Sequence, residues 1–148
     1  MKRTFSAAVL AVALSTTAHA GMITKTSAHS VGDTIDRLAA AVEKAGAKVF
    51  ARVDHAKGAA SVDADLRPTQ MLMFGNPKLG TPAMQGAQSM GLDLPLRVVA
   101  WQAEDGNVMV GYHDPAAVAA LHGLPSDHPT IAKMTGALNK LTTAATSD

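Results

Sequence analysis

The stretch that decides how this chain folds is QMLMFGNPKLGTPAMQGAQSMG, residues 70–91. Its apolar run Met71–Phe74 predicts a strand that is covered on at least one face. Gly75, Asn76 and Pro77 then favour a turn, because these residue types accept or impose unusual backbone dihedrals. The stretch therefore predicts a buried strand that passes through a loop into a helix.

The helix of this stretch is expected to begin at Thr81, a good N-cap, with Pro82 at its first helical position. A buried stripe at three-residue spacing is expected from Met84, Ala87 and Met90. Gly91 would then end the helix in a left-handed conformation.

The loop before this helix is a candidate binding site for an anion or a polar metabolite. A lysine beside a helix N-terminus combines free N–H donors with positive potential. The segment GNPKLGT lacks the GxxxxGK[ST] spacing of a phosphate loop, so an ordinary strand-to-helix connection is the competing interpretation. The ligand-binding residues expected here are Gly75, Asn76, Lys78 and Thr81.

The first twenty residues have the pattern of a secretory signal. Lys and Arg at 2–3 precede a short apolar segment at 5–14, and AHA at 18–20 fits a cleavage site. The apolar segment is too short to span a membrane, so no membrane insertion is expected after its removal. We therefore expect a periplasmic protein with a single domain over 21–148.

Composition narrows the class of function. Removing Lys2 and Arg3 from the 13 basic side chains leaves 11 against 12 acidic ones, a net charge of −1. That balance argues against a nucleic-acid binder or a protein that binds anionic membranes. The chain has no cysteine, which excludes disulfides and thiolate chemistry. No cofactor is expected.

Hydrophobic periodicity and turn residues predict the remaining elements. Further strands are expected at Met22–Ser27, Ala47–Val53, Leu96–Ala103 and Val108–His113. Helices are expected from Ser30 to Gly46, around Ala59–Asp63, from Pro115 to His122, and from Ile131 to Leu141. This order predicts an α+β fold, β-α-β4-α-like, with a mostly antiparallel sheet covered by helices on one face.

A second group of candidate residues comes from the expected hairpin at Asp105-Gly106. A two-residue turn there would place Arg97 opposite Asp114, with Trp101 and Tyr112 on the same face. These four side chains could form the floor of a polar pocket. The competing interpretation is an exposed cross-strand ion pair, with Asp114 acting as a helix cap.

Catalytic and metal sites have weaker support. His55, beside Asp54, and His113 are candidates for acid–base catalysis. No two histidines have the HxxxH or HExxH spacing, and no GxSxG motif is present, so neither a metal site nor a serine nucleophile is predicted. Copper binding by methionine and histidine stays an alternative, although Met71 and Met73 are needed to pack a strand.

Several segments carry a family resemblance. They are FGNPKLGTPAMQ at 74–85, GLDLPLRVVAWQAEDGNVMVGYHDP at 91–115, LHGL at 121–124 and VDHA at 53–56. In these the chain resembles the domain-of-unknown-function 302 family. The resemblance implies a fold like the TATA-binding-protein core, often dimeric, and implies no particular activity.

Three functions follow as hypotheses. The first is a non-catalytic binding or sensing module for a small anion or polar metabolite. The second is an acid–base enzyme that uses His55 or His113. The third is a structural protein whose apolar surface serves to form a homodimer. Neither a nucleic acid nor a membrane is expected as a partner.

Overall fold

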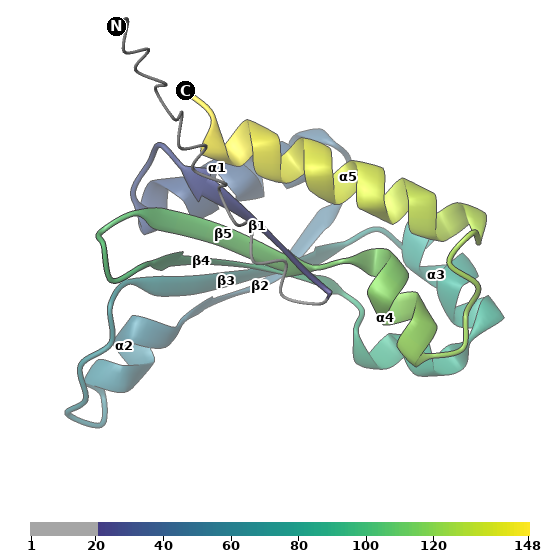
Figure 1. Ribbon diagram of the computed structural model, residues 1–148, viewed down its shortest axis with the longest axis horizontal. Helices are drawn as coiled ribbons and strands as arrows, with labels where there is room; N and C mark the ends of the chain where they lie inside the picture. The colour runs from purple at the N-terminus through teal and green to yellow at the C-terminus, as the bar shows by residue number, and fades with distance from the viewer. Residues whose placement is uncertain (1–20) are drawn as a thin grey trace, which may run out of the picture.

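The computed structural model describes residues 21–148, and the predicted secretory signal lies outside them. Its sheet has five antiparallel strands in the order β1-β5-β4-β3-β2 (Figure 1). They are β1 (Met22–Ser27), β2 (Lys48–Asp54), β3 (Thr69–Gly75), β4 (Leu96–Gln102) and β5 (Val108–His113). The predicted strands are confirmed, and their ends differ from these bounds by at most two residues.

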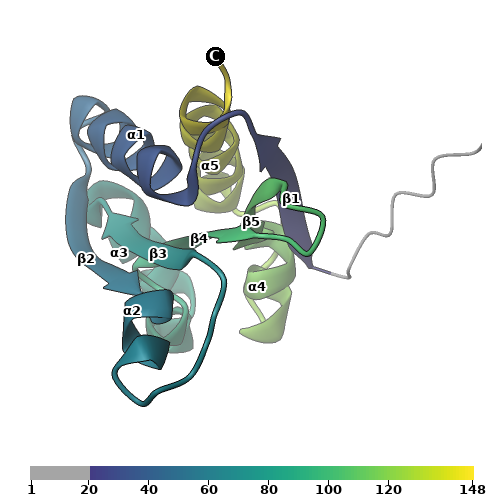
Figure 2. The same cartoon turned by 90° about the vertical axis from the view of Figure 1, so that its left-hand side faces the viewer.

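The helices are α1 (Val31–Lys44), α2 (His55–Ala60), α3 (Pro77–Gly86), α4 (Pro115–Leu121) and α5 (Pro129–Thr146), with a 3-10 helix, η1 (Gln88–Leu92). Helices α1 and α5 lie across one face of the sheet, as Figures 1 and 2 show. The α+β prediction is therefore confirmed. Within residues 21–148, none of the helices combines the length and the apolar character needed to cross a membrane.

The core lies between the sheet and these two helices. Helix α1 contributes Val31, Ile35, Leu38 and Val42 to the core. The sheet contributes Leu72, Phe74, Val98, Ala100, Val110 and Tyr112, and α5 contributes Leu138, Leu141 and Ala145. Helix α1 begins as predicted, since the Ser30 hydroxyl accepts the N–H of Asp33 and donates to its carboxylate. Gly46 follows it at φ +73°, a left-handed conformation that suits glycine.

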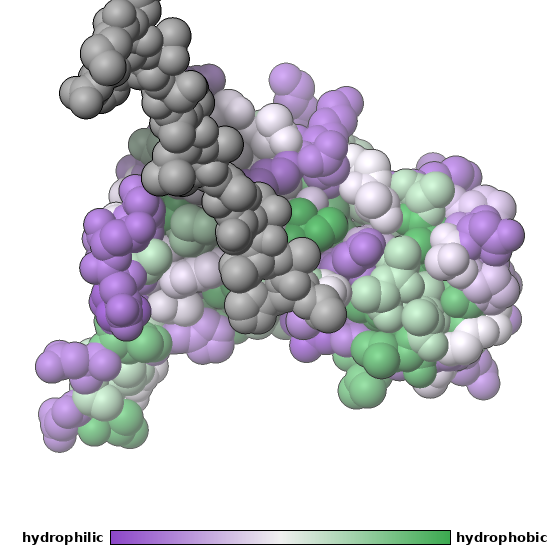
Figure 3. All heavy atoms as spheres, viewed as in Figure 1, coloured by the Kyte–Doolittle hydropathy of each residue, from purple (hydrophilic) through white to green (hydrophobic). Residues whose placement is uncertain are grey.

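The opposite face of the sheet is left uncovered by α1 and α5. Alternation along the strands places Met71, Met73, Val99, Trp101 and Met109 there, all of them half-buried. Helix α2 extends from one end of the sheet, and α3 and α4 lie at the other end (Figure 1). Apolar surface gathers over the tip of the α2 segment and near α4 (Figure 3).

Helix α3 begins five residues before the predicted start. Asn76 is its N-cap, accepting the N–H of Lys78, and Pro77 occupies the first turn. Thr81 and Pro82 therefore lie inside the helix, and the prediction that Thr81 is the cap was wrong. Asn-Pro and Thr-Pro both fit a helix start, and asparagine is the stronger cap.

Two other helix predictions are corrected. Helix α3 ends at Gly86 because the next residue, Ala87, is extended at φ −152°, so Gly91 lies in η1 rather than at the end of α3. The short helix near residue 59 begins earlier than predicted. The Asp54 side chain accepts the N–H of Lys57, which starts α2 at His55.

The β4–β5 hairpin has a longer turn than predicted. The Ala103 N–H donates to the Asn107 carbonyl, and Gly106 has φ +87°. The turn thus contains three residues, 104–106, with a left-handed glycine in the third position. Trp101 consequently pairs with Met109 instead of Val110, and this shift by one residue moves every later partner of β5 to the other face.

Candidate functional site

A groove with a volume of about 410 Å³ lies where α3, the end of β3 and α5 meet. Its walls are mainly apolar and include Phe50, Phe74, Leu79, Met84, Leu94 and Leu141. Asn76 and Thr81 add polar atoms, and none of the charged side chains within residues 21–148 lines it. Its volume lies within the usual range for small-molecule sites. We call this the α3 groove.

Two glycines leave room in the α3 groove. A Cβ atom on Gly75 would lie 3.6 Å from the Phe50 ring and from Pro95 Cβ. A Cβ atom on Gly80 would lie 3.7 Å from Leu94 Cδ1. Larger side chains at these positions would therefore occupy the space that a ligand needs.

The structure places three of the four predicted loop residues at the α3 groove. Gly75, Asn76 and Thr81 line it, whereas Lys78 is exposed and does not. The Lys78 N–H is also already bound, at 2.9 Å, by Asn76 Oδ1. The predicted cradle for an anion therefore lacks its lysine, and the cavity at this place is apolar.

The four candidates of the hairpin are not brought together. Arg97 pairs with Asp93, at 3.1 Å, rather than with Asp114. Asp114 caps α4 by accepting the N–H of Ala116, which is the role that the alternative interpretation of the hairpin predicted for it. Tyr112 is 4% exposed and belongs to the core, because the longer turn shifts it to the covered face.

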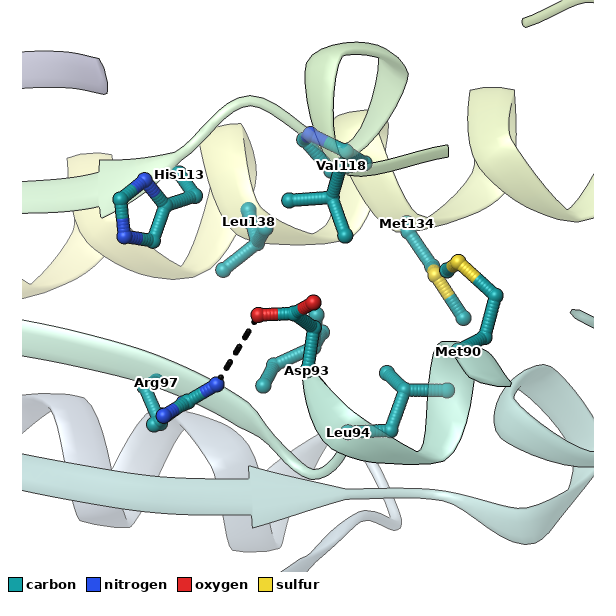
Figure 4. Close-up of a pocket in the computed structure, with 10 residues that line it drawn as sticks. Met90, Asp93, Leu94, Arg97, His113, Val118, Met134 and Leu138 are labelled. Carbon is teal, nitrogen blue, oxygen red and sulfur yellow. Dashed lines mark hydrogen bonds and ion pairs between the residues drawn. The ribbon is translucent and has the colours of Figure 1, made fainter. Parts of the chain in front are cut away.

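The two candidate catalytic histidines are both exposed. Among the described residues, neither His55 nor His113 has a hydrogen-bond partner for its ring. His113 borders a small cavity together with Arg97 and Asp93 (Figure 4). Over residues 21–148, no three His, Asp or Glu side chains come close enough together to hold a metal ion.

A third imidazole does have a carboxylate partner. His122, at the C-terminal end of α4, places Nε2 2.7 Å from Asp93 Oδ2. Its Nδ1 lies 2.9 Å from Ser89 Oγ, and its side chain is only 8% exposed. The sequence did not reveal this cluster, because its members come from η1, the loop after it and α4. The spacing of residues 89, 93 and 122 matches no short motif.

Comparison with known proteins places the chain in a family. A family model described as "Domain of unknown function DUF302" matches residues 23–141. The chain belongs to this family. A crystal structure titled as an uncharacterized conserved protein DUF302 from Bacillus stearothermophilus has a TM-score of 0.76. That match covers 84% of this chain and 97% of the other at 18% identity, which shows a common fold.

Curated relatives are larger proteins. The chain is 45% identical over 118 residues to proteins named "Fluoride-specific ion channel FluC 1" from Brucella suis and Brucella abortus. The match includes 78% of this chain but only 46% and 44% of these relatives. The chain therefore spans less than half of their length.

Proposed function

We propose that this DUF302 domain is a binding or sensing module that holds a small molecule in the α3 groove. The observation that carries the proposal is a cavity of about 410 Å³ that, in the part of the chain that the structure describes, is lined by no charged side chain. Burial of apolar ligand surface would supply most of the binding free energy.

The chemistry of the lining narrows the ligand class. Asn76 and Thr81 can hydrogen-bond one polar end of a ligand, and the rest of the lining suits a hydrocarbon or aromatic body. A carboxylate or phosphate would lose its hydration without finding a positive partner in the groove. The proposed ligand is therefore uncharged and amphipathic, in place of the anion that the sequence suggested.

Blocking the groove tests this proposal. Gly80→Leu fills the groove from α3, while Gly136→Leu adds the same side chain to an exposed position of α5 that has open space around it. The neutral probe N-phenyl-1-naphthylamine should bind the wild type and Gly136→Leu equally. Gly80→Leu should weaken binding about tenfold or more. Equal binding by both variants would contradict the proposal.

Competition then distinguishes the ligand classes. Decanol should displace the probe from the wild-type protein at lower concentration than decanoate does. The two competitors share a chain of ten carbons, so their difference reports the preference for an uncharged head. Stronger displacement by decanoate would show that the groove prefers an anionic ligand and would contradict the uncharged ligand proposed here.

A second candidate, homodimer formation, is supported by the open face of the sheet. That face carries an apolar surface that includes Trp101, and exposed apolar side chains flank it at both ends. Val62 (72% exposed) and Leu66 (49%) follow α2, while Leu92 (79%) and Leu121 (81%) lie at the other end. We propose that a second copy covers this face. Light scattering should show a dimer that Met73→Lys converts to a monomer, and a wild-type monomer at micromolar concentration would exclude it.

Similarity to the Brucella proteins favours a third candidate, an accessory role beside an ion channel. These proteins are named as fluoride-specific ion channels, and the shared region is less than half of each. Deleting the gene should then change the fluoride tolerance of its host. Unchanged growth across a fluoride series would remove this candidate.

We also propose that the protein works in the periplasm. The proposal rests on the charged start, apolar segment and AHA site within the first twenty residues. Osmotic-shock fractionation should find the protein in the periplasmic fraction, with its N-terminus at Gly21. Full-length protein in the cytoplasmic fraction would contradict this.

A further inference from the structure

Ser89, His122 and Asp93 form a chain of hydrogen bonds outside the α3 groove. Ser89 Oγ lies 2.9 Å from His122 Nδ1, and Asp93 Oδ2 lies 2.7 Å from His122 Nε2. Arg97 donates to the other carboxylate oxygen of Asp93, at 3.1 Å, and to the Leu92 carbonyl, at 3.2 Å. Asp93 is therefore held from two sides, and Figure 4 shows its pairing with Arg97.

The partners of the ring determine where its proton sits. A carboxylate only accepts hydrogen bonds, so the bond to Asp93 places the proton of the neutral imidazole on Nε2. Nδ1 is then an acceptor, and the Ser89 hydroxyl donates to it. A hydroxyl that donates to an imidazole, itself oriented by a carboxylate, is the arrangement that activates a serine nucleophile.

We propose that Ser89 is a nucleophile for acyl transfer from esters to water, with His122 as its general base and Asp93 as the residue that orients the ring. Ser89 is exposed, so a substrate can reach its hydroxyl, while His122 is nearly buried and held in one orientation. The order Ser, Asp, His along the chain does not matter, because such sites are defined by geometry and role.

The reaction balances with water as the only co-reactant. The Ser89 oxygen bonds to the ester carbonyl carbon as its proton passes to His122 Nδ1. The bond from that carbon to the alcohol oxygen breaks, and the alcohol leaves with the proton from His122. Water then attacks the acyl group, gives a proton to His122, and releases a carboxylic acid as the Ser89 hydroxyl is restored.

Covalent labelling tests the proposal on the protein without its first twenty residues. A fluorophosphonate probe should add to the wild type, and peptide mass spectrometry should place the adduct on Ser89. Ser89→Ala should abolish labelling, and His122→Gln should slow it about 100-fold, within the usual contribution of a general base. Ser61→Ala is the matched control, since Ser61 is exposed at the end of α2 and should leave labelling unchanged.

Turnover gives a second readout. p-Nitrophenyl acetate should release p-nitrophenol in a burst equal to the protein concentration. Ser89→Cys should retain an acylation step. The proposal is overturned if no adduct forms, if the adduct lies elsewhere, or if Ser89→Ala reacts as the wild type does. The Gly80→Leu groove variant keeps Ser89, Asp93 and His122, so a failure of the labelling experiment does not bear on the binding function.

Discussion

Asn76 Oδ1 accepts the backbone N–H of Lys78 at 2.9 Å, and this contact starts α3. Asn76 Nδ2 also donates to the Gly46 carbonyl at 3.3 Å, which ties the helix start to the end of α1. Asn76→Ala should therefore lower the free energy of unfolding by about 1–2 kcal/mol, the usual effect of removing an N-cap. Urea melts of both proteins measure the difference.

Thr81→Ala is the matched control for that experiment. Thr81 is exposed within the second turn of α3, and its N-cap role in the sequence-based prediction was wrong. Alanine favours a helix more than threonine, so the free energy of unfolding should change by no more than about 0.5 kcal/mol. A larger loss for Thr81→Ala than for Asn76→Ala would mean that the helix starts where the sequence suggested.

The hairpin turn offers a second prediction. Gly106 has φ +87°, and apart from its two chain neighbours no residue described by the structure has an atom within 4 Å of the position that its Cβ would occupy. Any effect of Gly106→Ala must then come from backbone strain rather than from a clash. We expect a loss of about 1–2 kcal/mol in urea melts, because a left-handed conformation is unfavourable for alanine. Gly136→Ala, in the exposed middle of α5, should instead stabilise by about 0.5–1 kcal/mol.

The sequence predicted the strands and the fold class because these depend on periodicity and turn residues. It missed the hairpin register, since Asp105-Gly106 fits a two-residue turn as well as the three-residue turn that the structure has. Because of the one extra residue in the turn, Tyr112 lies on the opposite face of the sheet from Trp101. The residues that face each other across a hairpin are thus predictable only once the length of the turn is known.

The lining of the α3 groove could be predicted in part for a related reason. The sequence singled out the lining residues Gly75, Asn76 and Thr81 because special backbone residues gather where strands meet helices. The apolar character of the α3 groove was missed, because Phe50 and Leu141 come from distant elements that no local pattern connects to the loop. Ser89 and His122 were missed for the same reason, being 33 residues apart in the sequence.

The packing of Trp101 on Gly111 gives a third prediction. A Cβ atom on Gly111 would lie 2.9 Å from the Trp101 ring, which is too close for the ring to stay in place. Gly111→Ala should therefore destabilise by about 1–3 kcal/mol through overpacking. Trp101 is the one tryptophan in the sequence, so its fluorescence should shift to longer wavelength as the ring becomes more exposed.

A double-mutant cycle isolates this contact. In the background Trp101→Ala the ring is absent, so Gly111→Ala should have little further effect on the free energy of unfolding. The interaction energy between the two positions should then be close to the full effect of Gly111→Ala alone. Additive losses in the double variant would show that the glycine is needed for another reason.

The last prediction concerns pH. Burial raises the pKa of the Tyr112 hydroxyl above its usual value of 10.0, the charge of Asp114 adds to the rise, and the Thr142 hydroxyl opposes it. Above pH 10 the unfolded chain releases this proton more readily than the folded protein does. By linkage, the free energy of unfolding must then fall as pH rises from 10 through the raised pKa, whereas below pH 10 Tyr112 has no effect on its pH dependence.

Tyr112→Phe removes the ionisation, so urea melts between pH 9 and 11 should show a shallower decline in the free energy of unfolding for the variant than for the wild type. Parallel declines would mean that Tyr112 ionises equally in both states.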